Sequence, residues 1–189
     1  KALAHGNPDL AQRALNRERQ ANKIFVLLLR LIFTAYQNPN LARAVGLDSG
    51  FPLIGYRTVA KNLELTADNA EDIAEIVIDA GENTLDVDDA TLREIREFTD
   101  TVNEMTELGV RSVVERDYDL ALQTKKLFRD VEDSQTEILT SLPEMDNDKL
   151  LQVREVLVAL QQTAQYAVRN AEIATNLALD TNSEYVTIT

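Results

Sequence analysis

Hydrophobic residues recur along most of the chain at intervals of three, four and seven, the spacing that places them on one side of an α-helix. This pattern predicts long helices over about 8–36, 53–79, 88–115 and 117–142, a last helix that begins after Asp148 and runs to about 177, and a short helix over 41–45. Asn7, Asp117 and either Asp88 or Asp89 are suited to cap helix N-termini, because their side chains accept hydrogen bonds from free backbone N–H groups. We therefore expect an all-α protein.

The last three predicted helices are amphipathic and are joined by short links. Their apolar stripes span Leu92–Val113, Leu120–Leu142 and Leu150–Leu177. Helices joined in this way pack as antiparallel neighbours, so this part of the chain predicts a three-helix bundle. Gly109 is a predicted weak point in the first of the three helices, because glycine lowers helix propensity.

An internal repeat relates the two halves of the chain. Residues 57–75, shifted by 97 positions, align with residues 154–172 without a gap and share eight identities in nineteen positions. A shorter echo pairs residues 9–11 with residues 119–121, at the start of the helix that precedes each repeated helix. The sequence therefore predicts tandem antiparallel helix bundles, of which the first lacks its leading helix.

The repeat divides the chain into a first repeat over 1–82, which is an incomplete bundle of two long helices, a second repeat over 83–180, and a polar C-terminal tail over 181–189. The helix pair of the first repeat would leave an apolar groove in water, which is unfavourable. We expect this groove to be covered either by a helix upstream of Lys1 or by a partner.

The composition argues against an enzyme. His5 is the one histidine and the chain has no cysteine, so a Ser-His-Asp triad, a thiolate nucleophile and a cysteine metal site have no basis. The glycines are too scattered to form a phosphate-binding loop. These absences favour a binding or regulatory protein.

The chain is strongly acidic, with 32 Asp and Glu against 19 Lys and Arg and a formal net charge of −13 at pH 7. This charge repels nucleic acid and anionic lipid, so DNA contact would need a segment outside this chain. The acidic residues are spread along the whole chain, and few of the basic residues are lysines. We therefore expect adaptation to high salt, where counter-ions screen the repulsion.

The longest apolar run, residues 24–33, is interrupted by Arg30 and is shorter than the roughly 20 residues that span a bilayer. The chain begins at Lys1 without a signal-peptide pattern. We expect a cytoplasmic protein with no membrane insertion, whose sequence begins inside a longer gene product.

Glu64, Asp68 and Asp72 lie four residues apart and so share one side of a predicted helix. Carboxylates stacked in this way repel one another by about a few tenths of a kcal/mol per pair unless cations lie between them. Their oxygen atoms suit Mg²⁺, Mn²⁺, Ca²⁺ or iron better than a closed structural zinc site. In so acidic a chain the same spacing also arises on an ordinary solvated helix face, and both interpretations stay open at this point.

Residues 63–75, with the sequence LELTADNAEDIAE, resemble the signature of the PhoU family of phosphate-uptake regulators, which reads roughly L-E-R-I-x-D-H-A-x-N-I-A-E. Residues 22–30 are similar to the D-R-L-x-F-L-L-x-R stretch of the archaeal branch, in which a PhoU-like module often follows an AbrB-like DNA-binding domain. The likeness extends over about residues 8–177 and implies PhoU-like tandem antiparallel helix bundles.

The resemblance also implies a multinuclear metal cluster, held by the E-x-x-x-D pair and by a second carboxylate pair on the preceding helix. In this chain the implied metal residues are Glu64, Asp68, Glu18 and Asn22, and the helical spacing of the carboxylates adds Asp72 as a candidate. We expect a weakened site because asparagine carries no charge. The expected cofactor is a metal ion, for which iron, zinc, manganese and magnesium are the candidates.

The second repeat departs further from the family pattern. Gln161 and Gln165 stand at the positions equivalent to the E-x-x-x-D pair, and Tyr166 stands where the family has histidine. A charge-neutralising cluster is not expected there, so we expect at most one cluster in the chain.

The resemblance implies a non-enzymatic regulator of phosphate uptake or of phosphate-responsive signalling and transcription. We expect it to act as a homodimer by contact with a phosphate transporter or its signalling partners, and to contact DNA only through an upstream AbrB-like domain. Two alternatives remain. One is a metal-free dimerisation module whose groove is completed by another subunit, and the other is a regulatory subunit of an ion transport system, such as one for potassium.

Overall fold

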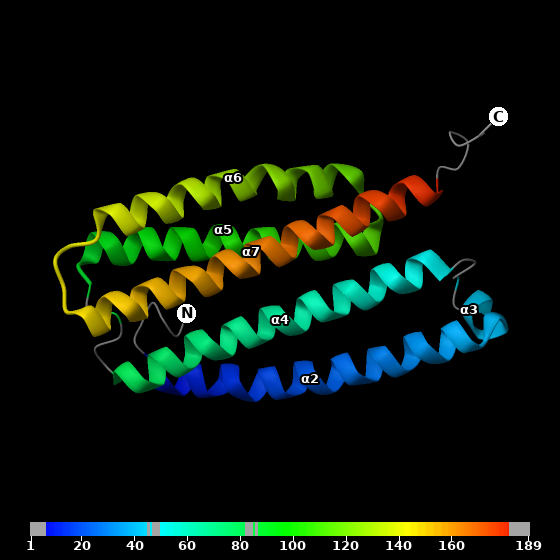
Figure 1. The fold of residues 1–189 in the computed structure, drawn as a ribbon, viewed down its shortest axis with the longest axis horizontal. Coiled ribbons are helices and arrows are strands. Elements are labelled where there is room, and N and C mark those ends of the chain that lie inside the picture. Colours follow the sequence, from blue (N-terminus) through cyan, green and yellow to red (C-terminus); the bar gives the residue numbers. More distant parts are fainter. Residues whose placement is uncertain (1–6, 45, 47–49, 82–84, 86, 182–189) are drawn as a thin grey trace.

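The computed structural model describes residues 7–44, 46, 50–81, 85 and 87–181. This part of the chain is helical, without strands, and contains α2 (Pro8–Gln37), α3 (Pro39–Ala44), α4 (Gly50–Ala80), α5 (Asp89–Glu115), α6 (Tyr118–Ser141) and α7 (Asn147–Thr181) (Figure 1). The predicted all-α fold is confirmed, and each helix begins and ends within a few residues of its predicted bounds. His5 and most of the predicted tail, from residue 182, lie outside the described residues.

The predicted N-caps explain where three of the long helices begin. The side chains of Asn7, Asp88 and Asp117 each accept a hydrogen bond from the backbone N–H three residues further on, at 3.1, 2.7 and 3.1 Å. Each bond satisfies a donor that the first helical turn would otherwise leave free. The capping predictions are therefore confirmed, with Asp88 as the cap of α5.

Helices α5, α6 and α7 pack around the largest hydrophobic core of the molecule. Its fully buried side chains come from all three helices and include Ile95, Phe98, Val102, Met105, Val131, Ile138, Val153, Val156 and Leu157. Helix α5 runs unbroken through Gly109, which lies directly against α7. A Cβ atom at Gly109 would lie 2.8 Å from the carbonyl oxygen of Ala167, so glycine lets the two helices approach closely.

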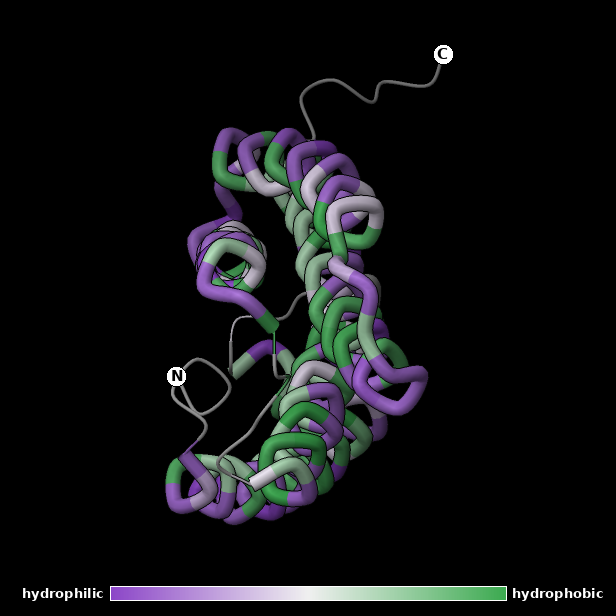
Figure 2. Tube along the Cα trace, turned by 90° about the vertical axis from the view of Figure 1, so that its left-hand side faces the viewer, coloured by the Kyte–Doolittle hydropathy of each residue, from purple (hydrophilic) through white to green (hydrophobic). Residues whose placement is uncertain are grey.

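The other two long helices extend this bundle sideways. Helix α4 packs on α7, and α2 packs on the other side of α4. Figure 2 shows the resulting arrangement, in which α6, α7, α4 and α2 follow one another in a curved row and α5 lies on its concave side. None of the helices in this described part combines the length and the apolarity that a membrane crossing requires.

The contact between α4 and α7 has the symmetry of the sequence repeat. Asn62 Nδ2 donates to Asn170 Oδ1 at 2.8 Å, and seven residues further along α4 Asn69 Nδ2 donates to Thr163 Oγ1 at 3.1 Å, seven residues earlier on α7. If each residue of α4 is exchanged with the residue 97 positions later on α7, the antiparallel pairing of the two helices stays the same. Helices α4 and α7 are therefore related by an approximate two-fold axis.

The helix starts follow the same offsets as the sequence repeats. Helix α7 begins 97 residues after α4, and α6 begins 110 residues after α2, as in the echo of residues 9–11. The predicted boundary between the repeats lies at residues 82 and 83, outside the described part of the chain, and it stays a prediction.

Candidate functional site

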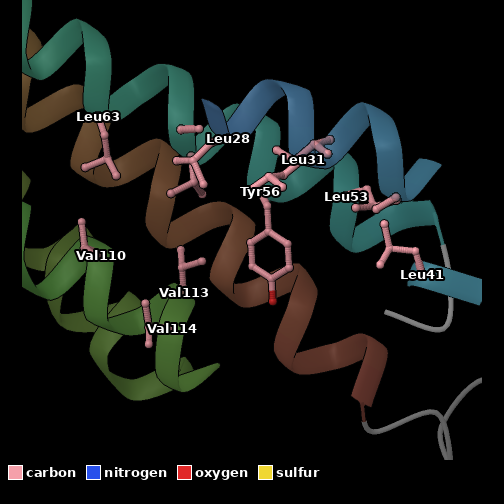
Figure 3. A pocket seen from close by; sticks show the side chains of 13 residues that line it. Leu28, Leu31, Leu41, Leu53, Tyr56, Leu63, Val110, Val113 and Val114 are labelled. Atoms are coloured by element: carbon pink, nitrogen blue, oxygen red, sulfur yellow. The ribbon is translucent and has the colours of Figure 1, made fainter. Parts of the chain in front are cut away.

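An apolar groove of about 470 Å³ opens between α2, α4 and the C-terminal end of α5 (Figure 3). Its lining is aliphatic apart from one tyrosine and consists of Leu28, Leu31, Ile32, Ala35, Leu41, Leu53, Tyr56, Val59, Ala60, Leu63, Val110, Val113 and Val114. Arg116 Nη2 donates to the hydroxyl of Tyr56 at 3.4 Å, so the polar end of that side chain is already engaged. The apolar groove predicted for the first helix pair is present.

Several side chains of this groove are far more exposed than aliphatic side chains usually are. Leu31 and Val114, on opposite walls, are 55% and 76% exposed. Burying an aliphatic side chain is worth about 1.5–3 kcal/mol, so covering this groove would be favourable. The sequence did not predict the wall formed by α5, because a periodic pattern does not reveal which distant helix lies alongside another.

A cluster of carboxylates lies where α2 packs against the middle of α4. We call the side chains of Glu18, Glu64, Asp68, Glu71 and Asp72 the acidic seam. Glu18 is 6% exposed, although it is charged, and Asp72 is exposed. The helical register of α4 places four of these residues on one side, and α2 contributes Glu18 from across the contact.

Two neighbouring polar groups bind the acidic seam directly. The Nζ atom of Lys61 forms an ion pair with Glu64 Oε2, and Asn22 Nδ2 donates to Glu18 Oε1. Lys61 also lies over the ring of Phe25, with its Nζ atom 5.4 Å from the ring centre, a distance typical of a cation–π contact. The positive charge of Lys61 is therefore held at the α2/α4 contact.

The charge of Glu18 on α2 acts on carboxylates of α4. Burial and then the charge of Glu64 raise the pKa of Asp68, with smaller contributions from Glu18 and Asp72, and Lys61 opposes this rise. Burial and then Glu18 raise the pKa of Glu71. Glu18 is thus close enough to α4 for its charge to be felt there, as the family resemblance implied.

The side chains of the seam, as they are arranged, do not fit a metal cluster. Within residues 7–44, 50–81 and 87–181 no group of three or more His, Cys, Asp or Glu side chains converges as metal ligands do. One oxygen of Glu64 is paired with Lys61, and Asn22 is bound to Glu18. No step of the function proposed below runs through a metal, and metal binding by Glu64, Asp68, Glu18, Asn22 and Asp72 stays a prediction.

The equivalent positions of the second repeat carry no carboxylate. Gln161 and Gln165 are half-buried, and the Tyr166 ring lies beneath the guanidinium of Arg169, 5.4 Å from its carbon. The second repeat therefore has no counterpart of the acidic seam at these positions.

Sequence reasoning missed Lys61 and Glu71. Acids four residues from Glu64 or Asp68 include neither, since Lys61 is basic and Glu71 is three residues from Asp68. The i, i+3 spacing of Lys61 and Glu64 on one helix face could have revealed the ion pair. The approach of Glu71 to Glu18 depends on how α2 lies on α4 and has no local signal.

Comparison with known proteins connects one part of the chain with a family. The family model described as PhoU domain matches residues 1–77, a range that includes α2, α3 and most of α4. No curated protein and no solved structure matches the chain at a significant level. The matched range therefore contains the acidic seam and most of the groove.

Proposed function

Over residues 1–77 this chain belongs to the PhoU family, and from this premise we propose that it regulates phosphate uptake by protein contact at the apolar groove. The PhoU family is a regulatory family, and the match to it supports a general role in the control of phosphate uptake. The groove is the observation that supports a contact mechanism.

The chemistry of the groove suits a protein segment better than a small ligand. Pockets for small molecules combine apolar walls with a few polar groups that fix the orientation of the ligand. Here the polar group of the lining, the Tyr56 hydroxyl, is bound to Arg116. Helices that dock on proteins instead insert aliphatic side chains at i, i+3, i+4 and i+7 into an apolar groove.

The partner that the family suggests is a phosphate transporter or one of its signalling proteins. A role in transcription would need a DNA-binding segment outside this chain, because a net charge of −13 opposes binding to a phosphate backbone. A metal-free assembly module, in which a second subunit completes the groove, is favoured by the Lys61–Glu64 ion pair, which supplies a positive charge to the seam.

The test is phosphate uptake in cells that lack the native protein and carry a variant. Leu28→Asp together with Leu63→Asp places two charges in the groove, and Leu122→Asp places one on an equally exposed site of α6 outside it. We expect the groove variant to leave phosphate uptake unregulated, as in cells without the protein, and the α6 variant to restore wild-type control. Circular dichroism of each purified variant establishes that its helices are intact.

Two results would contradict the proposal in different ways. If removing the protein leaves phosphate uptake and its response to phosphate unchanged, the role in phosphate regulation is wrong. If the folded groove variant regulates uptake as well as the wild type does, the role is retained but the groove is not the contact surface.

A further inference from the structure

A second groove, of about 580 Å³, lies between α4 and the N-terminal half of α7. We call it the acidic groove, and its lining comes from residues 72–79 of α4 and 151–162 of α7. Four of the lining side chains are carboxylates and one is basic, and these are Asp72, Glu75, Asp79, Glu155 and Arg154. All five are exposed, so their charges face the solvent.

The acidic groove opens on the side of α4 and α7 that faces away from α5. Asp72 is nine residues, or about two and a half helical turns, from Leu63 of the apolar groove, so the two side chains lie on opposite sides of α4. Val158 is likewise nine residues from Ala167, the part of α7 that lies against Gly109 of α5. The two grooves are therefore separate surfaces.

Aliphatic side chains lie between the carboxylates of the acidic groove. Leu151 and Val158 are 54% and 46% exposed and are seven residues apart, on one side of α7. Ile76 of α4, half-buried, adds to the same apolar area. The groove thus combines negative charge with apolar surface that is favourable to cover.

The two-fold relation between α4 and α7 gives the acidic groove a counterpart at the other end of this helix pair. The offset of 97 residues places the counterpart at residues 54–65 of α4 and 169–176 of α7. Its equivalent positions carry one acidic and three basic residues, which are Glu172, Arg57, Lys61 and Arg169. The acidic excess therefore belongs to one end of the pair and not to both.

We infer that the acidic groove binds a basic amphipathic helix of a partner protein. Lysine and arginine side chains of that helix would pair with the carboxylates, and its aliphatic side would cover Leu151 and Val158. The inference concerns a second surface and is independent of the contact proposed at the apolar groove.

The dimensions of the acidic groove suit a helix. Residues 151–162 of α7 extend over about 17 Å at 1.5 Å per residue, so a helix of about twelve residues would lie along them. Helix α5 packs in the same manner on the antiparallel pair of α6 and α7. A third helix on the pair of α4 and α7 would therefore repeat a packing that this molecule already contains.

The chemistry of the acidic groove disfavours other classes of ligand. Nucleic acids and anionic lipids are negatively charged, and the four carboxylates would repel them. Among the described residues, no three carboxylates of the groove converge as metal ligands do. A small cation such as a polyamine would leave the exposed Leu151 and Val158 uncovered.

The experiment measures the binding of synthetic peptides by fluorescence anisotropy in about 0.15 M KCl. The probe is a helix of about 18 residues, or five turns, with leucine on one side and lysine on the other. One control peptide has the same composition in an order that spreads leucine around the helix. A second control has glutamate in place of lysine.

Two pairs of variants locate the binding site. Glu75→Lys together with Asp79→Lys reverses two charges of the acidic groove, and Glu97→Lys together with Asp100→Lys makes the same change at exposed positions of α5. Leu151→Ser removes an aliphatic side chain from the groove, and Leu179→Ser removes one that is 63% exposed elsewhere on α7. Circular dichroism establishes that each variant keeps its helices.

We expect the charge reversal in the groove to weaken binding of the leucine–lysine peptide about ten-fold or more, and the reversal on α5 to weaken it about two-fold or less. Leu151→Ser should weaken binding several-fold and Leu179→Ser should leave it unchanged. The two control peptides should bind much more weakly than the probe.

Four results would overturn the inference. The first is that the probe does not bind. The second is equal weakening by the two charge reversals, which would mean attraction to the net charge alone. The third is equal binding of the shuffled peptide, which would mean that the apolar side is not recognised. The fourth is loss of binding in Leu28→Asp with Leu63→Asp but not in Glu75→Lys with Asp79→Lys, which would place the helix in the apolar groove.

Discussion

Asp68 is a residue of the acidic seam whose pKa is raised by its surroundings. Burial and the neighbouring charge of Glu64 raise its pKa, so the folded protein favours the protonated carboxyl more than the unfolded chain does. The stabilisation that follows from this preference is present at low pH and is lost as the pH rises through the raised pKa. At neutral pH the ionised Asp68 therefore destabilises the fold.

We expect Asp68→Asn to raise the midpoint of thermal unfolding at pH 7 and to lose this advantage as the pH falls below the ordinary carboxyl pKa of about 3.9, where the wild-type carboxyl becomes protonated as well. Asp72→Asn, on the exposed edge of the seam, serves as the control and should change the midpoint less. A lower midpoint for Asp68→Asn at pH 7 would mean that the ionised carboxylate holds a partner, as a metal cluster requires.

Lys61 supplies the positive charge that the seam contains. We expect Lys61→Met, which keeps most of the apolar stem, to lower the free energy of unfolding by about 0.5–1 kcal/mol, because the ion pair with Glu64 and the contact with Phe25 are both lost. Lys23→Met, at an exposed position on α2, is the matched control. The free energy of unfolding is measured in urea. If both variants lower it equally, Lys61 does not stabilise the acidic seam.

The purified wild-type protein also tests the metal prediction. Elemental analysis of the purified wild type shows whether a metal is bound, and unfolding before and after EDTA treatment shows whether it matters. If a metal ion neutralises the seam, EDTA should lower the midpoint of the wild type, and added Mn²⁺ or iron should restore it. If Lys61 alone neutralises the seam, EDTA should change nothing.

At the scale of helices, the close approach of α5 and α7 depends on the absence of a side chain at Gly109. We expect Gly109→Ala to destabilise the protein by about 1–3 kcal/mol, because the new Cβ atom would lie 2.8 Å from a backbone oxygen of α7 that cannot move aside easily. This loss outweighs the gain of up to about 1 kcal/mol in helix propensity. Equilibrium urea unfolding measures the difference.

Gly55→Ala is the control for this substitution. Gly55 is also inside a long helix, but its added Cβ atom would meet a side-chain atom, Ile173 Cγ2, at 3.1 Å. A side chain can shift by a few tenths of an ångström, so Gly55→Ala should cost much less. Equal effects of the two variants would show that the α5/α7 distance does not set the stability.

The helices could be predicted because their signals are local. The caps at Asn7, Asp88 and Asp117 and the apolar spacing depend on residues within a few turns of one another. The placement of α5 beside α2 and α4 could not be predicted in the same way, since Val110 and Val114 are more than 80 residues away from Leu28 along the chain. Likewise, Glu18 was predicted to lie beside Glu64 and Asp68 only from the family resemblance, and the part played by Lys61 was not predicted.

At the scale of the whole molecule, acidic residues outnumber basic ones by 32 to 19. Glu94, Glu97, Asp100, Glu104 and Glu107 form the exposed side of α5, as the sequence predicted. Arg111 pairs with Glu115 at 3.0 Å at the end of that helix, but the acidic residues before it greatly outnumber the basic ones. The folded state therefore brings like charges together that the unfolded chain keeps further apart.

Salt should relieve this repulsion. We expect the midpoint of thermal unfolding to rise between dilute buffer and 1 M KCl, because the screening length falls from more than about 10 Å to about 3 Å. The variant Glu97→Gln, Asp100→Asn, Glu104→Gln, Glu107→Gln removes four exposed negative charges without touching the core, and its midpoint should be higher in dilute buffer and rise less with salt. A wild-type midpoint that stays constant or falls would show that charge repulsion does not limit the stability of this protein, and a rise that is equal in the variant would assign the salt effect to apolar burial instead.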